Sequence, residues 1–273
     1  VYKRQTLRFL FQPSEEKSDE EGLSGAQRMA QDGAMKGVDA VIGLHVHSGT
    51  PVGTITVSPG PATAGVDGFW ATIKGRGTHG AYPHKGLDPI HISAHVILAL
   101  HGIVSRRVNP FDPAVISLGS IHSGHASNVI PETVEISGTI RYEEPEVQTL
   151  LHAEIERALE VARTMGGDYE FGIRYGSPPV LNNAGVVELI EQVGAELLGP
   201  DKVKPREQGM GAEDFSVFTR LAPGAMFRLG CQIDGEERKG HNPGFDIDEA
   251  CLPVGAAILA ETALRLLRQS ADE

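Results

Sequence analysis

The sequence predicts an α/β protein into which a smaller ferredoxin-like domain is inserted. Both ends of the chain alternate between apolar, strand-like runs and amphipathic helices, the pattern of a layered α/β sheet. The middle of the chain instead follows the order β-α-β-β-α-β, which is that of the ferredoxin-like arrangement. We therefore expect residues 1–65 and 177–273 to form one domain and residues 66–176 to form the insert.

The first part contains three predicted strands and one helix. Residues 7–11 form an apolar run that Pro13 ends, because proline has no N–H to donate to a sheet. Residues 22–37 follow as a helix, residues 38–47 as a second buried strand and residues 52–57 as a third.

Strands in the insert are predicted from side-chain alternation. Residues 133–141 and 168–175 alternate apolar and polar or aromatic positions, as half-buried strands do, and residues 68–75 and 115–121 complete the set of four.

Helices in the insert are predicted from capping residues and from the spacing of apolar residues. Asp88 can cap a helix that has Pro89 at its first position. We expect its inner face to carry Ile90, Ala94, Ile97, Leu98, His101 and Val104. The second helix has its apolar positions at Val147, Leu151, Ile155, Ala158, Leu159 and Ala162.

The last part returns to the first pattern. Residues 184–198 are expected to form a helix with Val187, Ile190, Val193 and Leu197 inward. A loop at 209–215 then enters a short helix, and residues 225–230 form a strand. After the loop 240–246, Asp248 can cap a final helix, which is apolar along Leu252, Ala256, Leu259 and Leu266.

Composition excludes several classes of function. The net charge of −12 and the lack of a basic block argue against a nucleic-acid partner. No apolar run approaches the roughly 18 residues of a membrane span, so no membrane is expected as a partner. Cys231 and Cys251 are the only cysteines, which argues against a disulfide framework and favours a reducing, cytoplasmic location.

Polar side chains that can bind metal follow several of the predicted strands. Glu15 and Glu16 follow the first strand, His45 and His47 end the second, and His241 lies in the loop before the last helix. Imidazole and carboxylate are both ligands of zinc and similar ions. The alternatives are a solvated acidic loop at 15–21 and structural histidines, and spacing alone does not decide, since no compact metal-binding motif is present.

Six short motifs are spread over the whole chain. They are Phe11-Gln12-Pro13-Ser14-Glu15-Glu16, Gly43-Leu44-His45-Val46, Gly77-Thr78-His79-Gly80-Ala81-Tyr82-Pro83-His84, Asn128-Val129-Ile130-Pro131, Gly211-Ala212-Glu213-Asp214-Phe215 and His241-Asn242-Pro243-Gly244-Phe245. In this order they resemble the zinc-dependent aminoacylase/carboxypeptidase family, and within it the branch of hippurate hydrolases, N-acyl-L-amino acid amidohydrolases and indole-acetyl-amino-acid hydrolases. The resemblance implies a three-layer metallopeptidase-type catalytic domain, partial in this chain, with the insert as a dimerisation domain.

The resemblance also implies roles for individual residues. Glu15 would be the general base that takes a proton from the attacking water and passes it to the leaving amine. Glu16 and His241 would ligate one divalent ion and His45 a second, the ions being zinc, or manganese, cobalt or nickel. His79 would reach across a homodimer to stabilise the oxyanion. Asn128 and Arg141 would hold the carboxylate of an N-acyl amino acid; without the family, Arg141 reads as an ordinary surface ion pair.

One part of the family pattern is missing from the chain. Members of the family use an upstream histidine and a bridging cysteine or aspartate, and no such segment precedes Gln5. The chain also opens at Val1, without methionine, and runs directly into a strand-like segment. We therefore expect an N-terminally truncated chain that binds metal weakly and is inactive by itself.

Alternatives to this assignment concern both the function and the remaining polar residues. A dipeptidase or desuccinylase of the same family is one alternative, and a non-catalytic protein that binds a small acid is another. The histidine pairs His91/His95 and His122/His125 are expected at the surface or in a dimer interface. Glu213 and Asp214 are expected behind the ligands or at a helix cap, and Cys251 in the core.

Overall fold

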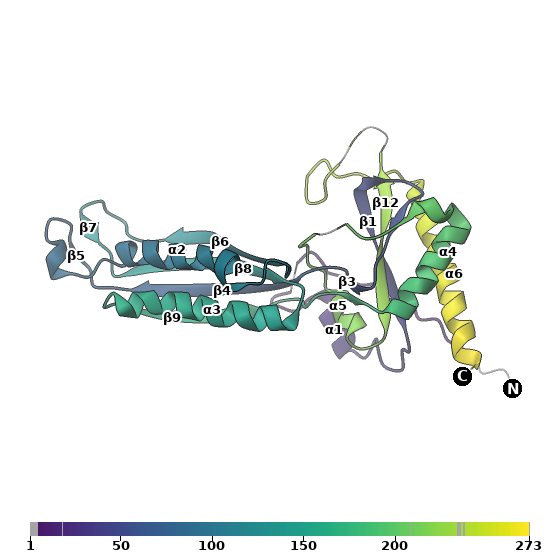
Figure 1. Ribbon diagram of the computed structural model, residues 1–273, viewed down its shortest axis with the longest axis horizontal. Helices are drawn as coiled ribbons and strands as arrows, with labels where there is room; N and C mark the ends of the chain where they lie inside the picture. Colours follow the sequence, from purple (N-terminus) through teal and green to yellow (C-terminus); the bar gives the residue numbers. More distant parts are fainter. Residues whose placement is uncertain (1–4, 18, 208, 234–235, 237, 273) are drawn as a thin grey trace. The chain divides into compact units, whose positions relative to one another are not determined.

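Two compact units make up the chain in the computed structural model, which describes residues 5–17, 19–207, 209–233, 236 and 238–272 (Figure 1). Unit 1 comprises residues 1–63, 180–209 and 213–273, and unit 2 comprises residues 64–179 and 210–212. The predicted boundaries after residues 65 and 176 lie two and three residues from the observed divisions. Within the described residues, no helix is both long enough and apolar enough to cross a membrane.

Unit 1 contains a four-stranded sheet in the order β1-β12-β2-β11. Its elements are α1 (Gly25–Gln31), β1 (Val41–Pro51), β2 (Ile55–Thr56), β3 (Gly60–Pro61), β10 (Leu181–Asn182), α4 (Ala184–Leu198), the 3-10 helix η2 (Pro200–Lys202), β11 (Val203–Lys204), α5 (Ser216–Thr219), β12 (Gly224–Gln232) and α6 (Cys251–Asp272). The central strands β1 and β12 run parallel, whereas β12 and β2 run antiparallel.

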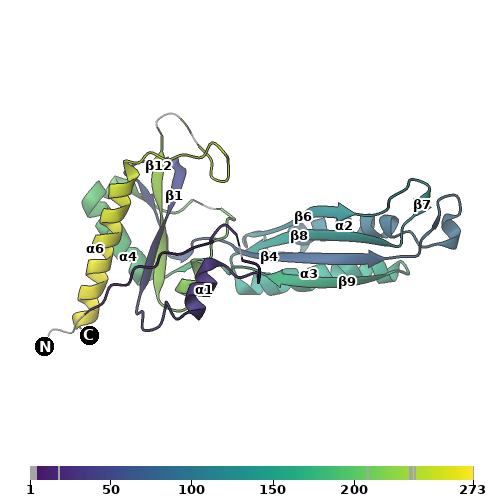
Figure 2. The same cartoon turned by 180° about the vertical axis from the view of Figure 1, so that it is seen from behind.

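Helices cover both faces of this sheet, so unit 1 has three layers. α4 and α6 pack on one face through an apolar cluster that includes Ile190, Phe227 and Ile258. α1 and α5 pack on the other face through a second cluster that includes Ala26 and Phe218. The two views show α4 and α6 on one side of β1 and β12 and α1 on the other (Figures 1 and 2). The α/β class predicted from the alternation of elements is confirmed.

The first predicted strand is not present in the structure. Residues 5–14 have no regular secondary structure, and Phe11 is 87% exposed. A strand needs a neighbour for its N–H and C=O groups, and no described strand pairs with this segment. It is held instead by the Arg8 guanidinium, which donates to the carbonyls of Ala34 and Lys36.

The first helix is shorter than the predicted range 22–37. Ser24 caps α1 in a capping box with Gln27, so the helix begins only at Gly25. It ends at Gln31, and Gly33 and Gly37 then adopt positive φ angles of 83° and 71°, which no α-helix accommodates.

Gly25 lets α1 approach the segment that carries the two glutamates. A Cβ atom on Gly25 would lie 1.5 Å from the carbonyl oxygen of Pro13, and its N–H donates to the carbonyl of Ser14 at 3.3 Å. No side chain larger than hydrogen fits there without moving the backbone.

Unit 2 has the predicted order β-α-β-β-α-β. Its elements are β4 (Gly65–Lys74), β5 (Thr78–His79), the 3-10 helix η1 (Pro83–Lys85), α2 (Pro89–Arg107), β6 (Ala114–His122), β7 (Val129–Ile130), β8 (Thr133–Tyr142), α3 (Pro145–Thr164) and β9 (Asp168–Tyr175). The main sheet has the order β6-β8-β4-β9 with every pair antiparallel, and α2 and α3 share one apolar core with it. This is the ferredoxin-like arrangement expected from the periodicity.

Helix α2 turns a different face to the core from the one predicted. Asp88 caps it as expected, but Ile92, Val96 and Leu100 are buried, whereas Leu98 is 71% exposed. α2 is apolar on two sides, so the spacing of apolar residues does not decide which side is buried. In contrast, the apolar positions predicted for α3 are all buried.

The faces of α4 and α6 were also predicted only in part. Leu197 and Leu252 are exposed, and Cys251, Gly255 and Ile258 face the sheet instead. Small residues point inward on α6 because the helix lies close to β12: a Cβ on Gly255 would be 2.7 Å from the Leu229 side chain.

The chain leaves and re-enters unit 1 at adjacent points. Within unit 1, the N–H of Val180 donates to Thr63 Oγ1 at 3.1 Å, and the N–H of Ala62 donates to the carbonyl of Val180 at 2.7 Å. Within unit 2, the N–H of Val66 donates to the carbonyl of Ser177 at 2.8 Å. Nearby, the fully buried carboxylate of Asp67 accepts from the N–H of Gly176 at 3.0 Å.

Replacing Gly25 with alanine is expected to lower the free energy of unfolding by about 1–3 kcal/mol, because the added methyl group overlaps the Pro13 carbonyl. Urea or thermal unfolding measures the change. Gly102→Ala in α2 is the matched control: nothing lies within 4 Å of its added Cβ, so it should stabilise or be neutral. Equal effects of the two substitutions would contradict the close contact.

Candidate active site

A buried carboxylate fixes the segment that carries Glu15 and Glu16. Asp214 is 2% exposed, and its Oδ1 accepts from the side-chain amide of Gln12. Its Oδ2 accepts from the N–H of Ala26 in the first turn of α1 at 3.0 Å. Asp214 therefore ties the irregular segment 12–16 to both α1 and the loop before α5. Ser14 lies in the chain between Gln12 and Ala26, the two residues that Asp214 contacts. Its φ of 50° is in a region that non-glycine residues seldom occupy.

Glu16 lies next to His241, as the sequence predicted. The distance between Glu16 Oε2 and His241 Nδ1 is 3.4 Å, and both side chains are largely exposed. Two ligand atoms each about 2.1 Å from one ion in tetrahedral geometry are themselves about 3.4 Å apart. The pair therefore fits a shared divalent ion without rearrangement. His241 has a φ of 61°, so the backbone is strained on this side of the site as well.

His45 lies on the exposed part of β1 and presents one ring nitrogen for binding. Its Nδ1 is 2.7 Å from the carbonyl of Val46, so this nitrogen carries the proton and Nε2 is left as the ligand atom. His47, two residues further along the strand, has its Nδ1 2.9 Å from the hydroxyl of Thr50.

Three carboxylates gather beside these ligands. Oxygens of Glu15, Glu213 and Asp214 lie within 4.8 Å of one another. Burial raises the pKa of Glu15, and Glu16 and Asp214 raise it further, while His45 and His241 oppose the rise. Burial, followed by repulsion from Glu15, raises the pKa of Glu213 to about 7. One proton is therefore retained in this cluster close to neutral pH.

The arrangement matches what metal-assisted proton transfer needs. Glu15 is partly buried with a raised pKa, and Glu16, its neighbour in the chain, is exposed beside an imidazole. Electrostatic effects of both His45 and His241 reach the Glu15 carboxylate. A group that binds a proton is thus placed next to groups that bind a cation.

His79 and Asn128, two predicted site residues in unit 2, lie side by side. β5 and β7 pair so that His79 faces Val129, and the N–H of Gly80 donates to the carbonyl of Asn128 at 2.7 Å. His79 is exposed, and its Nδ1 accepts from the N–H of Ala81 at 3.1 Å.

Arg141 lies at the opposite end of unit 2 from His79 and Asn128. It pairs with Val66 at the start of β4, whereas β5 and β7 lie beyond the far end of β4 (Figure 1). The stretch of β8 from Thr133 to Arg141 alone spans roughly 26 Å, at about 3.3 Å per residue. One copy of the chain therefore does not bring Asn128 and Arg141 to the same carboxylate.

The Arg141 guanidinium has no acidic partner among the described residues. It is half-buried, its only side-chain hydrogen bond there goes to the carbonyl of Ile140, and burial lowers its pKa. Arg141 therefore does not form the alternative, a surface ion pair, with any residue that the structure describes. An unpaired, half-buried guanidinium can receive an anion.

Other polar residues lie mostly where the sequence suggested. His91 and His95 are exposed with ring centroids 5.0 Å apart, His122 and His125 are exposed, and Cys251 is buried. Sequence reasoning missed that Asp214 binds Gln12. The one available signal was that Gln12 and Asp214 both belong to motifs that also carry site residues.

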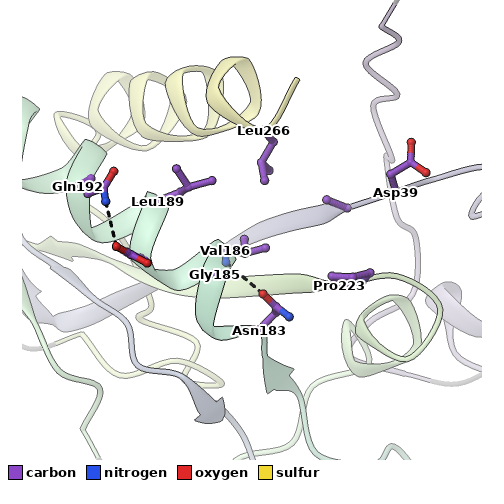
Figure 3. A pocket seen from close by; sticks show the side chains of 10 residues that line it. Asp39, Asn183, Gly185, Val186, Leu189, Gln192, Pro223 and Leu266 are labelled. Atoms are coloured by element: carbon purple, nitrogen blue, oxygen red, sulfur yellow. Dashed lines mark hydrogen bonds between the residues drawn. The ribbon is translucent and has the colours of Figure 1, made fainter. Parts of the chain in front are cut away.

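A hollow of about 370 Å³ in unit 1 contains none of these residues. It lies beside the first turn of α4, where the Asn183 side chain caps the helix by accepting from the N–H of Val186, and Leu266 of α6 closes one side (Figure 3). The hydrogen bonds drawn there are internal to α4 and its cap, so we assign the hollow no role.

Comparison with known proteins identifies the family to which the sequence is similar. Residues 2–265 match the sequence profile of Peptidase family M20/M25/M40. The chain is 34% identical to "IAA-amino acid hydrolase ILR1-like 2" of Arabidopsis thaliana, over 98% of its own length and 61% of the relative's. It is 36% identical to "N-acetyl-L-cysteine deacetylase" of Bacillus subtilis, over 96% and 61%.

Solved structures show the same fold. A dinuclear metal binding peptidase from the M20 family of Bacillus subtilis superposes with a TM-score of 0.79 at 30% identity, over 94% of this chain and 64% of that one. The chain thus spans somewhat less than two thirds of the length of each of these three proteins.

The raised pKa of Glu213 predicts a pH-dependent stability in metal-free protein. The folded state holds this proton up to about pH 7 and the unfolded state only to about 4.5, so the stability contributed below pH 4.5 is lost as pH rises to 7. Glu213→Gln should therefore gain about 3 kcal/mol over wild type across that window. Urea unfolding with a chelator measures it, with Glu191→Gln on the exposed side of α4 as control. Parallel curves for wild type and Glu213→Gln would contradict the assignment.

Proposed function

Because this chain belongs to peptidase family M20/M25/M40, we propose that it acts as a metal-dependent amidohydrolase on N-acyl amino acids. The observation that carries the proposal is the Glu16–His241 pair with Glu15 beside it. The names of two relatives, an amino acid hydrolase and a deacetylase, support an amide of an amino acid, such as a hippurate-like compound, as substrate.

We assign the donor set to two divalent ions. Glu16 and His241 would hold one ion, and His45 through Nε2 would hold the second. Imidazole with carboxylate suits zinc, manganese, cobalt or nickel. Ions bound there polarise the amide carbonyl and lower the pKa of water.

Glu15 is the general base in this proposal. Its partly buried carboxylate takes a proton from the attacking water and delivers it to the leaving nitrogen. Burial, followed by repulsion from Glu16 and Asp214, raises the pKa of Glu15, which favours its role as a proton acceptor. Glu213 and Asp214 lie next to Glu15, with carboxylate oxygens of all three residues within 4.8 Å of one another.

A homodimer through unit 2 completes the proposal. Within one copy, Asn128 and His79 lie far from Arg141, so a shared carboxylate requires residues from two copies. The outer face of α2 exposes Ile90 and Leu98, and the edge strand β6 exposes Ile121, which gives a second copy an apolar surface to cover. In this arrangement His79 stabilises the oxyanion and Arg141 binds the substrate carboxylate.

Metal titration of the 273-residue chain tests the ligand set. We expect weak zinc binding and no turnover at trace metal, because Glu16 and His241 supply two ligands and His45 one, where three or four protein ligands are usual. Glu16→Gln and His241→Ala should each lower the affinity at least about tenfold by calorimetry. His122→Ala, at an exposed position of β6, is the control. Tight binding that survives both substitutions would refute the assignment.

The substitution Glu15→Gln tests whether Glu15 acts as a general base or as a metal ligand. It should leave zinc affinity within about threefold of wild type, yet lower hydrolysis of an N-acyl amino acid at saturating metal by at least about 100-fold. If the protein only binds small acids, Glu15→Gln should leave its affinity for those acids unchanged. Loss of metal together with activity would make Glu15 a ligand instead.

Leu98→Glu tests the dimer. The charge would be buried against the partner's apolar surface, so the association constant should fall at least about tenfold by sedimentation. Leu221→Glu, at an exposed leucine of unit 1, is the control. A wild-type chain that stays monomeric at all concentrations would refute the proposal.

A further inference from the structure

A row of four polar residues crosses the sheet of unit 1 beside the candidate metal site. The register pairs His45 with Arg228, Arg228 with Thr56, and Thr56 with Lys204. Their neighbours along the strands belong to, or pack against, the apolar cluster under α4 and α6, as Leu44, Leu229 and Ile55 do. Side chains alternate along a strand, so the four polar residues share the opposite face.

Arg228 is an unusual member of this row. It is the one charged residue in β12, and the other residues from Gly224 to Cys231 are buried. Within the described part of the chain, no side-chain hydrogen bond or ion pair involves its guanidinium, which is half-buried. Burial lowers its pKa and the nearby Arg206 lowers it further, with Glu207 partly opposing. A desolvated cation beside a like charge costs free energy, and a bound anion would offset that cost.

Space for a ligand lies on the same side of the sheet. A hollow of about 430 Å³ is lined by Thr54, Thr56, Lys204 and Glu207, among others. Thr56, which lines the hollow, is the β2 partner of Arg228, although Arg228 itself is not among the lining residues. Its volume is within the range of small-molecule sites.

We propose that Arg228 binds a carboxylate at the far end of the substrate's acyl group, so that the preferred substrates are N-acyl amino acids with a dicarboxylic acyl group. The inference rests on the proposed function, which places the scissile amide at His45. Neighbouring strands are about 4.8 Å apart, so Arg228 is one strand away from His45 and Lys204 about 14 Å away. An acyl chain of about four or five carbons, succinyl or glutaryl, spans from the amide to the guanidinium.

The amino acid's own carboxylate is the other possible source of the anion. Arg141 is already assigned to it, and the two possibilities give different specificities. If Arg228 binds the carboxylate at the end of the acyl group, replacing Arg228 affects only substrates with an ω-carboxylate. If Arg228 binds the carboxylate of the amino acid, replacing Arg228 affects every substrate with a free α-carboxylate.

Three ligands distinguish these cases by calorimetry on the zinc-loaded protein: N-succinyl-L-leucine, N-pentanoyl-L-leucine and N-succinyl-L-leucinamide. We expect both succinyl compounds to bind at least tenfold more tightly than the pentanoyl compound. Arg228→Met should abolish that preference and Arg228→Lys should restore part of it. Arg220→Met, at an exposed arginine of unit 1, should leave it unchanged.

Stability measurements guard against misfolding. Arg228→Met should melt at or above the wild-type temperature, because a half-buried charge beside Arg206 is removed. Succinate should raise the melting temperature of wild type and not that of the variant. Equal affinity for the succinyl and pentanoyl compounds, or a preference that survives in a folded Arg228→Met, would overturn the inference. So would a loss of affinity that follows only the α-carboxylate.

Hydrolysis separates this inference from the proposed function. Cleavage of both leucine compounds without preference would leave the amidohydrolase standing and reject the role of Arg228. A succinyl preference in binding, without cleavage of either compound at saturating metal, would support the anion site and reject the hydrolase.

Discussion

The buried carboxylate of Asp214 is the contact on which the candidate site depends. Glu15 and Glu16 lie in a segment without regular secondary structure, so no ladder of backbone hydrogen bonds fixes their position. Asp214 supplies the missing restraint by accepting from Gln12 on one side and from the first turn of α1 on the other. Gly25 allows α1 to approach closely enough for both bonds to form. The acidic motif, the helix and the loop before α5 therefore take up their positions together.

Charge is divided across the site in a way that suits amide hydrolysis. Carboxylates gather around Glu15, imidazoles stand beside them, and Arg228 lies one strand beyond His45. The acidic side retains a proton near neutral pH, and Arg228 forms no ion pair with a described residue. Both conditions cost folding stability, which is the usual consequence of arranging charges for a ligand or a reaction instead of for the fold.

The sequence predicted those features that local rules control. The Asp88–Pro89 start of α2, the alternation of β8 and the buried face of α3 follow from capping and periodicity, and each is confirmed. The proximity of Glu16 and His241 was predicted from motifs and is observed. Residues 7–11 did not form a strand, because strand formation depends on a partner that local sequence does not reveal. The faces of α2 and α6 were mistaken because both helices are apolar on more than one side.

Long-range contacts account for the rest. Nothing in the local sequence shows that Gln12 meets a carboxylate more than 200 positions later, or that Arg228 stands next to His45. A charged residue inside the apolar run 225–230 was a visible signal, since an apolar strand seldom carries an arginine without a reason.

The hydrogen bonds that join Thr63 and Ala62 to Val180 make the insert separable from its host. Because the two cut ends already touch, a short peptide bridge could replace residues 64–179 without altering the path of unit 1. Such a junction allows the inserted segment to be removed or exchanged as a single piece.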